Sequence, residues 1–173
     1  MKNKVLVMDT SYLCCWLGIP GKETCGKRGN VWDESKVTGL IDEETKKGAT
    51  LILPLAAIIE TGNHIAQASN LRYELAKKLA NIMLKAADEE SPWGAFTTQG
   101  ELWENEGLKK LANEWPELAV QKLTIGDASI KNVAEFYARA GNIVEILTGD
   151  DGLKAYQPVI DIPVPRRRKR RNS

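Results

Sequence analysis

The sequence predicts an α/β fold with a central parallel, doubly wound sheet. Short apolar runs alternate with helical patterns along the chain, and this alternation is typical of βαβ units. The first run, Val5–Met8, is continuously apolar, as expected of a strand that is buried on both faces. At 173 residues, the chain is long enough for one domain whose core needs no disulfide or structural metal.

Three further runs are predicted as strands of this sheet. Residues 49–54 end at Pro54, and residues 142–147 follow Gly141, which suits the C-terminus of a preceding helix. Residues 159–162 lie between prolines, so we expect an edge strand there.

Helical patterns lie between these runs. Asp33 is placed to cap a helix that runs to Lys47, and Asn70 is placed to cap another. The apolar stripe of the second helix has a spacing of four residues and consists of Leu71, Leu75, Leu79 and Met83. Further helices are expected over residues 55–71, 101–114 and 127–140.

Two stretches fit the alternation poorly. Residues 18–30 contain four glycines and Pro20, which indicates a flexible loop. Residues 86–118 contain eight acids, two bases and three of the five tryptophans, which indicates an acidic helical insertion. We therefore divide the chain into a domain over residues 1–163, with the acidic lobe 86–118 inserted in it, and a basic tail over residues 164–173 that is expected to be disordered.

The formal charge of +1 conceals a division between the body and the tail. Six bases and no acid lie in the last eight residues, namely Arg166, Arg167, Arg168, Lys169, Arg170 and Arg171. The rest of the chain holds 18 bases against 23 acids, a charge of about −5. We expect the tail to bind nucleic-acid phosphates. The alternatives are a solvated charge run, or a tail that lies on the acidic lobe until RNA displaces it.

The composition indicates a cytoplasmic protein with reduced thiols. The most apolar run, residues 51–59, is far short of the roughly 20 residues of a membrane-spanning helix, so we expect no membrane association. The apolar stretch near the N-terminus stops at Asp9, too early for a secretory signal. Three cysteines without a CxxC pair, together with a single histidine, argue against a zinc site.

Four carboxylates are placed near the carboxyl ends of the predicted strands, where ligands bind in doubly wound sheets. They are Asp9, Glu60, Asp127 and Asp150. A simpler role is open for two of them, because Asp127 is also placed as a helix N-cap and Asp150 as a turn former. Asp9 ends an apolar strand, where a carboxylate is costly to bury without a partner.

Glu60 is the only acid in residues 55–71, which contain no Lys or Arg and are therefore expected to form an enclosed helix. Helical spacing turns Glu60 away from the apolar arc and places it beside Asn63 and His64, which are candidate supporting residues. A lone histidine, however, is more often structural. The apolar arc consists of Leu55, Ile58, Ile59, Gly62, Ile65 and Ala66.

Four carboxylates at one edge of a sheet repel each other unless a cation neutralises them. No Lys or Arg is adjacent to any of the four in the sequence. The expected counter-charge is therefore a hard divalent ion held by oxygen ligands, Mg²⁺ or Mn²⁺. Such an ion suits phosphodiester hydrolysis, because it polarises a phosphoryl oxygen and helps to generate hydroxide.

With these residues in place, the sequence resembles the PIN-domain family of nucleases, which includes many prokaryotic toxin–antitoxin ribonucleases. The resemblance covers most of residues 4–162 in order. It rests on four short motifs: the strand leading into Asp9-Thr10-Ser11, Glu60 in the helix after the second strand, Gly126-Asp127-Ala128-Ser129-Ile130 at the start of a helix, and Ile146-Leu147-Thr148-Gly149-Asp150.

The resemblance implies a three-layer α/β/α sandwich around the parallel sheet. It also implies a metal-dependent endonuclease that acts mostly on RNA. In it the four acids bind one or two Mg²⁺ or Mn²⁺ ions, and Thr148, with Thr10 or Ser11, steadies the site. It also implies an antitoxin-like protein partner and a homodimer as expectations for this chain. The acidic lobe and the arginine-rich tail depart from the compact toxins of the family.

Other classes of protein fit the sequence less well. A phosphatase of the haloacid-dehalogenase type needs a second Asp where Ser11 stands, and neither a dinucleotide-binding nor a P-loop glycine motif is present. A receiver domain requires an acidic pair near the first strand, where this chain has one acid. The remaining alternative is a non-catalytic PIN-like module that binds RNA or a partner protein.

Overall fold

A computed structural model of the chain describes residues 3–159. The strands in this part are β1 (Lys4–Met8), β2 (Thr24–Lys27), β3 (Asn30–Asp33), β4 (Thr50–Ile52) and β5 (Ile143–Leu147). The helices are α1 (Thr10–Leu17), α2 (Glu34–Lys46), α3 (Leu55–Gln67), α4 (Arg72–Ala87), α5 (Asn105–Val120), α6 (Ile125–Arg139), α7 (Asp151–Lys154) and the 3₁₀ helix η1 (Phe96–Trp103). Residues 160–162 of the predicted fourth strand and the basic residues 166–171 lie outside the described residues.

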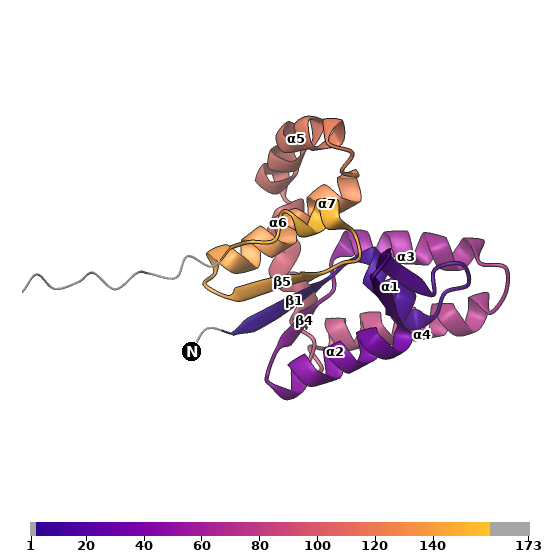
Figure 1. Ribbon diagram of the computed structural model, residues 1–173. Helices are drawn as coiled ribbons and strands as arrows, with labels where there is room; N and C mark the ends of the chain where they lie inside the picture. Colours follow the sequence, from indigo (N-terminus) through magenta and orange to yellow (C-terminus); the bar gives the residue numbers. More distant parts are fainter. Residues whose placement is uncertain (1–2, 160–173) are drawn as a thin grey trace, which may run out of the picture.

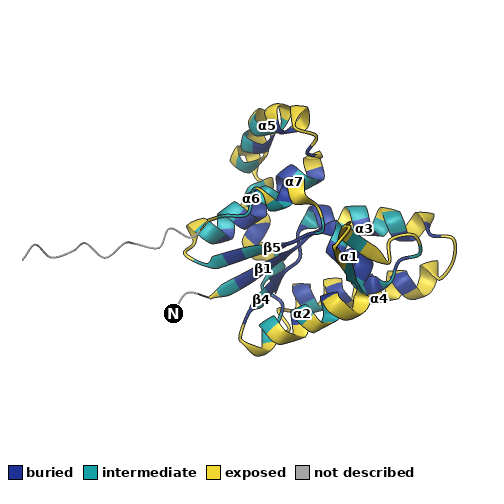
Figure 2. Cartoon of the chain, viewed as in Figure 1, coloured by how far each residue is buried: buried dark blue, intermediate teal, exposed yellow. Residues whose placement is uncertain are grey.

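A parallel sheet in the order β4-β1-β5 lies among the helices, which confirms the mixed α/β class (Figure 1). The middle strand β1 pairs with both neighbours, so that Leu6 is opposite Leu51 and Glu145. Figure 2 shows the strands of this parallel sheet as largely buried and the helices as buried on one side. Between residues 3 and 159, no helix combines the length and the apolar character needed to cross a membrane.

The outer edge of β4 is covered by a short segment of the predicted acidic lobe. The backbone N–H of Leu51 donates to the carbonyl of Pro92 at 2.8 Å, and that of Gly94 donates to the carbonyl of Leu51 at 2.9 Å. Trp93, between them, is buried in the main core. The beginning of this lobe is therefore part of the central sheet and its packing.

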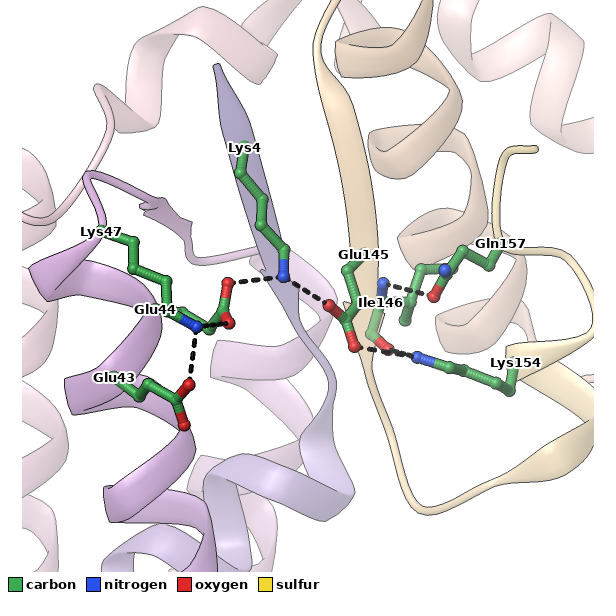
Figure 3. Close-up of polar contacts among 8 residues, drawn as sticks. All are labelled: Lys4, Glu43, Glu44, Lys47, Glu145, Ile146, Lys154 and Gln157. Atoms are coloured by element: carbon green, nitrogen blue, oxygen red, sulfur yellow. Dashed lines mark hydrogen bonds and ion pairs between the residues drawn. The ribbon is translucent and has the colours of Figure 1, made fainter. Parts of the chain in front are cut away.

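The outer edge of β5 is covered by side chains from the segment around α7 (Figure 3). The N–H of Ile146 donates to Oε1 of Gln157 at 3.1 Å, and Nζ of Lys154 donates to the carbonyl of Ile146 at 2.8 Å. Lys154 also pairs with Glu145, which in turn pairs with Lys4 of β1. These contacts satisfy backbone groups that an edge strand otherwise leaves open to another chain.

Residues 18–30 are more ordered than predicted, because β2 and β3 form an antiparallel hairpin over residues 24–33. Gly26 has a φ of +92°, and a Cβ at this position would collide with the carbonyl of Asn30. The ring of Trp32 lies 5.2 Å from that of Tyr12, which packs the hairpin on α1. The prediction of a flexible loop was wrong here, because the glycines serve strand and turn conformations.

The ends of the helices confirm some sequence predictions and correct others. Asp33 caps α2 by accepting a hydrogen bond from the N–H of Lys36 at 2.9 Å, as predicted. Asn70 does not cap α4; Leu71 precedes this helix in a left-handed conformation with a φ of 55°. Leu71 and Met83 are exposed, so the predicted apolar stripe is buried only in its middle.

The predicted helix over residues 101–114 consists of two elements. The 3₁₀ helix η1 ends at Trp103, and α5 then runs to Val120 with Pro116 inside it. Ion pairs join α5 to α6, since Lys110 contacts Glu135 at 3.3 Å and Lys131 contacts Glu114 at 3.7 Å. Part of the negative charge of the acidic lobe is therefore neutralised within the domain.

Candidate functional site

The four predicted carboxylates line one cavity of about 470 Å³. Asp9 directly follows β1, Asp150 follows β5 after two residues, Glu60 belongs to α3, and Asp127 belongs to α6. Strands β1 and β5 are parallel neighbours, so their carboxyl ends meet at the same edge of the sheet (Figure 1). The structure thus brings together acids that are up to 141 residues apart in the sequence.

Asp9 is the most enclosed of the four, with 4% of its surface exposed. Its Oδ2 accepts hydrogen bonds from the hydroxyls of Ser11 at 2.6 Å and Thr148 at 2.7 Å, and from the N–H of Ser11 at 3.3 Å. Burial raises the pKa of Asp9, and these hydrogen bonds counteract part of the rise. Ser11 and Thr148 are therefore positioning residues for this carboxylate, as the resemblance implies.

The same hydroxyls connect Asp9 to the segment that carries Asp150. The N–H of Gly149 donates to Oγ of Ser11 at 2.9 Å, and the N–H of Asp150 donates to Oγ1 of Thr148 at 3.0 Å. Asp150 in turn caps α7, because its Oδ1 accepts from the N–H of Leu153 at 2.9 Å. The ends of β1 and β5 are thereby held in one arrangement.

Glu60 reaches the cavity between α1 and α6. Its Oε2 accepts a hydrogen bond from the hydroxyl of Thr10 at 2.8 Å. Its carboxyl group also lies against Gly126 in the first turn of α6, where an added Cβ would approach Cδ of Glu60 to 2.8 Å. Gly126 thus leaves room for the carboxyl group of Glu60, and its backbone has no positive φ.

Helix α3 faces the core with small side chains, which corrects its predicted orientation. Ala57 and Thr61 are fully buried, whereas Ile59 is 54% exposed. The helix packs against α1 and α6, and small side chains allow the close contact that brings Glu60 to Gly126. Of the two predicted neighbours of Glu60, His64 lines the cavity, while Asn63 is exposed and does not line it.

Asp127 belongs to a capping box at the start of α6, which begins two residues earlier than predicted. Thr124 is the N-cap, and its hydroxyl accepts a hydrogen bond from the N–H of Asp127 at 3.0 Å. Oδ2 of Asp127 accepts from the N–H and the hydroxyl of Thr124 at 3.0 and 2.9 Å. Asp127 therefore has a structural role in addition to its place in the cavity.

The hydrogen bonds found for the four carboxylates converge on one oxygen of each. These atoms are Oδ2 of Asp9, Oε2 of Glu60, Oδ2 of Asp127 and Oδ1 of Asp150. Within residues 3–159, no three Asp, Glu, His or Cys side chains are close enough together to form a finished set of metal ligands. The four acids therefore line one cavity, but their carboxyl groups are not in direct contact as a set of metal ligands.

Three kinds of residue that the sequence interpretation missed also line the cavity. The thiols of Cys14 and Cys25 face it, and burial raises their pKa to about 11 and about 12. Thr24 and Thr124 add hydroxyl groups, and Lys22 is the one Lys or Arg among the described residues that line it. The sequence carries a local signal only for Thr124, which stands three residues before Asp127 as in a capping box.

Comparisons of the chain with protein-family models, with curated proteins and with solved structures find no match. The chemistry of the cavity is therefore the basis for the function proposed below.

Replacing Asp9 by Asn should stabilise the protein near neutral pH, by about 1 kcal/mol. The amide oxygen can still accept from Ser11 and Thr148, while the buried charge is lost. Because the pKa of Asp9 is raised in the fold, its contribution to stability is complete below its ordinary value of 3.8 and decreases as the pH rises through the raised value. Urea unfolding of both proteins at pH 7 and pH 4 measures the difference in their unfolding free energies. This difference should be smaller at pH 4 than at pH 7.

The exposed Asp42 of α2, replaced by Asn, is the matched control for this comparison. Equal unfolding free energies for Asp9→Asn and the wild-type protein at pH 7 would contradict the conclusion that burial of the Asp9 carboxylate lowers the stability of the fold.

Proposed function

We propose that this protein is a divalent-metal-dependent endonuclease that hydrolyses phosphodiester bonds, most readily in RNA, and that it is a PIN-like protein. The observation that supports this proposal best is the placement of Asp9, Glu60, Asp127 and Asp150 around one cavity at the carboxyl ends of parallel strands. Acids from four separate segments repel each other in such a place unless a cation is bound.

The donor groups of the cavity fit a hard cation, Mg²⁺ or Mn²⁺. Carboxylates and hydroxyls are the oxygen ligands that such ions prefer. The thiols of Cys14 and Cys25 have raised pKa values and remain protonated near neutral pH, which makes them poor ligands for a softer metal. Asp9, Glu60, Asp127 and Asp150 would hold the ion, directly or through water. When bound, it would polarise a phosphoryl oxygen and lower the pKa of water.

Other side chains around the cavity orient the carboxylates or are placed to contact substrate. Ser11 and Thr148 hold the carboxylate of Asp9 in a fixed orientation through Oδ2. Thr10 does the same for Glu60 through Oε2. Such fixed orientations lower the cost of binding a charged ligand, because the acids do not have to reorganise first. His64 is placed to donate a hydrogen bond to substrate from the wall formed by α3.

One observation favours the alternative of a non-catalytic module that binds RNA or a partner protein. Asp127 and Asp150 each cap a helix, so their identity is partly explained without any metal. The two proposals differ in one consequence, because only the nuclease requires a charge at position 150.

Asp150→Asn should abolish Mn²⁺-dependent cleavage of RNA while leaving the fold intact. Asparagine caps a helix about as well as aspartate, so α7 is expected to keep its N-terminus. The loss should be at least about a hundredfold, as for other groups that stabilise charge in a reaction. The measurement is gel analysis of a mixed single-stranded RNA incubated with Mn²⁺.

Asp151→Asn is the matched control, because Asp151 is adjacent, exposed and paired with Lys27 outside the cavity. Cleavage by Asp150→Asn at the wild-type rate would remove Asp150 from the proposed site, and equal wild-type activity in EDTA would contradict the dependence on a metal. A wild-type protein that binds RNA or a partner protein and shows no cleavage with Mn²⁺ would favour the non-catalytic module.

Gly126→Ala should separate folding from metal binding. The new methyl group meets only the end of the flexible Glu60 side chain, and alanine is the better helix former by up to about 1 kcal/mol. We therefore expect an equal or higher melting temperature in EDTA. The displaced carboxylate should reduce the rise in melting temperature that Mn²⁺ gives to the wild-type protein.

Gly39→Ala in α2 is the control, because a Cβ at this position meets no atom within 4 Å. If Gly126→Ala keeps the full Mn²⁺-dependent rise, Glu60 does not belong to the metal site.

The tail residues 166–171 are proposed to hold nucleic acid by contact with phosphates. Six neutralised charges on a single strand predict a slope of about −4 in a plot of log affinity against log salt, at ~0.7 per charge. Deletion of residues 166–173 should therefore make the slope less steep by about 4, at ~0.7 for each lost charge. An unchanged slope in fluorescence anisotropy would show that the tail does not bind nucleic acid.

An antitoxin-like partner and a homodimer remain predictions from the resemblance alone.

A further inference from the structure

We propose that Lys22 is the residue that binds a phosphate of the nucleic-acid substrate in the cavity of the four acids, an assignment that rests on the proposed function. Among the described residues that line the cavity, it is the one Lys or Arg. A polyanionic substrate that enters a cavity with four carboxylates requires positive charge from the protein as well as from a cation.

A tight turn places Lys22 at the cavity. The sequence Ile19-Pro20-Gly21-Lys22 has proline and glycine at the central positions of a type II turn, and Gly21 has the positive φ, +81°, that this turn requires. The turn is closed by the N–H of Lys22, which donates to the carbonyl of Ile19 at 2.8 Å. The backbone of Lys22 is thus fixed at the last position of the turn.

The turn is itself anchored to the core. Ile19 is 1% exposed, and its N–H donates to the carbonyl of Cys14 at 3.1 Å at the end of α1. The next turn of the chain leads into β2, whose Thr24 and Cys25 line the same cavity. Lys22 is therefore held at the cavity by a turn that is anchored in the core.

The ammonium group of Lys22 is available to a ligand. It forms no ion pair with any residue between 3 and 159, although four carboxylates line the same cavity. Its charge reaches the interior, because burial raises the pKa of the Cys14 thiol and Lys22 counteracts part of this rise. A mobile point charge on a long side chain suits a phosphate whose position changes during a reaction.

Lys27, at the end of β2, provides an internal comparison with Lys22, which lies just before this strand. It is paired with Asp151 and lies outside the carboxylate cavity. Both lysines are exposed and five residues apart, so the two substitutions remove the same charge from nearly the same surface. Any difference between them reports on the position of the charge in the cavity.

The test compares the wild-type chain with Lys22→Met, Lys22→Arg and Lys27→Met. The probe is a fluorescent single-stranded RNA with 2′-O-methyl groups, titrated in EDTA and in Ca²⁺ over a range of salt concentrations. We expect Lys22→Met to weaken binding roughly tenfold and to reduce the salt slope by about 0.7. Lys22→Arg should restore most of the affinity, and Lys27→Met should differ from wild type less than twofold.

Cleavage of unmodified RNA with Mn²⁺ gives the second readout. A phosphate contact made before the reaction predicts a higher KM for Lys22→Met, with a smaller effect on kcat. Melting temperatures of the wild-type protein and the two Lys22 variants should agree, since Lys22 forms no ion pair with a described residue. Lys27→Met should differ little from them, because it removes only an exposed ion pair with Asp151.

The outcomes separate this inference from the proposed function. If the wild-type protein cleaves RNA and Lys22→Met matches Lys27→Met in affinity, slope and KM, the assignment of Lys22 is overturned and the nuclease stands. If the wild-type protein binds RNA without cleaving it and Lys22→Met weakens that binding, the assignment stands and the nuclease is overturned. A wild-type protein that neither binds nor cleaves overturns both.

Discussion

The burial of one carboxylate, that of Asp9, is the constraint on which the rest of the site depends. A charged group at the end of a buried strand is tolerated only if polar partners surround it, and here they come from two directions. Ser11 lies two residues further along the chain, whereas Thr148 comes from the end of β5. The pairing of β1 with β5 and the hydrogen bonds of Asp9 therefore support each other. The same constraint fixes the position of Asp150, whose N–H donates to the hydroxyl of Thr148.

A second constraint is the close packing of α3 against α1 and α6. Ala57 and Thr61 face the interior, and a larger side chain at Gly126 would occupy the space of the Glu60 carboxyl group. Small side chains at helix contacts are usually explained by packing alone. In this protein they also bring a carboxylate to the start of α6, where the partial positive charge of the helix N-terminus favours it. Packing and electrostatics thus act in the same direction at this contact.

The distribution of charge gives the domain two different surfaces. Four acids and one lysine line the cavity. Around α5, in contrast, lysines are paired with acids within the domain, as in the pairs formed by Lys110 and Lys131. At the opposite end of the sheet, Lys4 connects β1 with α2 and β5 through Glu44 and Glu145 (Figure 3). Positive charges that support the fold are therefore paired, and the one in the cavity is unpaired among residues 3–159.

The sequence by itself determined the α/β class, the order of the main strands and helices, and the four acids near the ends of strands. These features follow from local periodicity and from the cost of ending an apolar strand at Asp9, which are properties of neighbouring residues. Only the tertiary structure decided which face of α3 is buried, that Asn63 lies outside the cavity while His64 lines it, and that Gly26 and Gly29 belong to a hairpin. It also decided that Lys22 lines the same cavity as the acids and that Asp127 forms a capping box from the third position of α6. The physical reason is that these features depend on distances between segments far apart in the chain, such as Glu60 and Gly126. The closeness of such segments is set by the packing of side chains between them, which a pattern along the sequence does not contain.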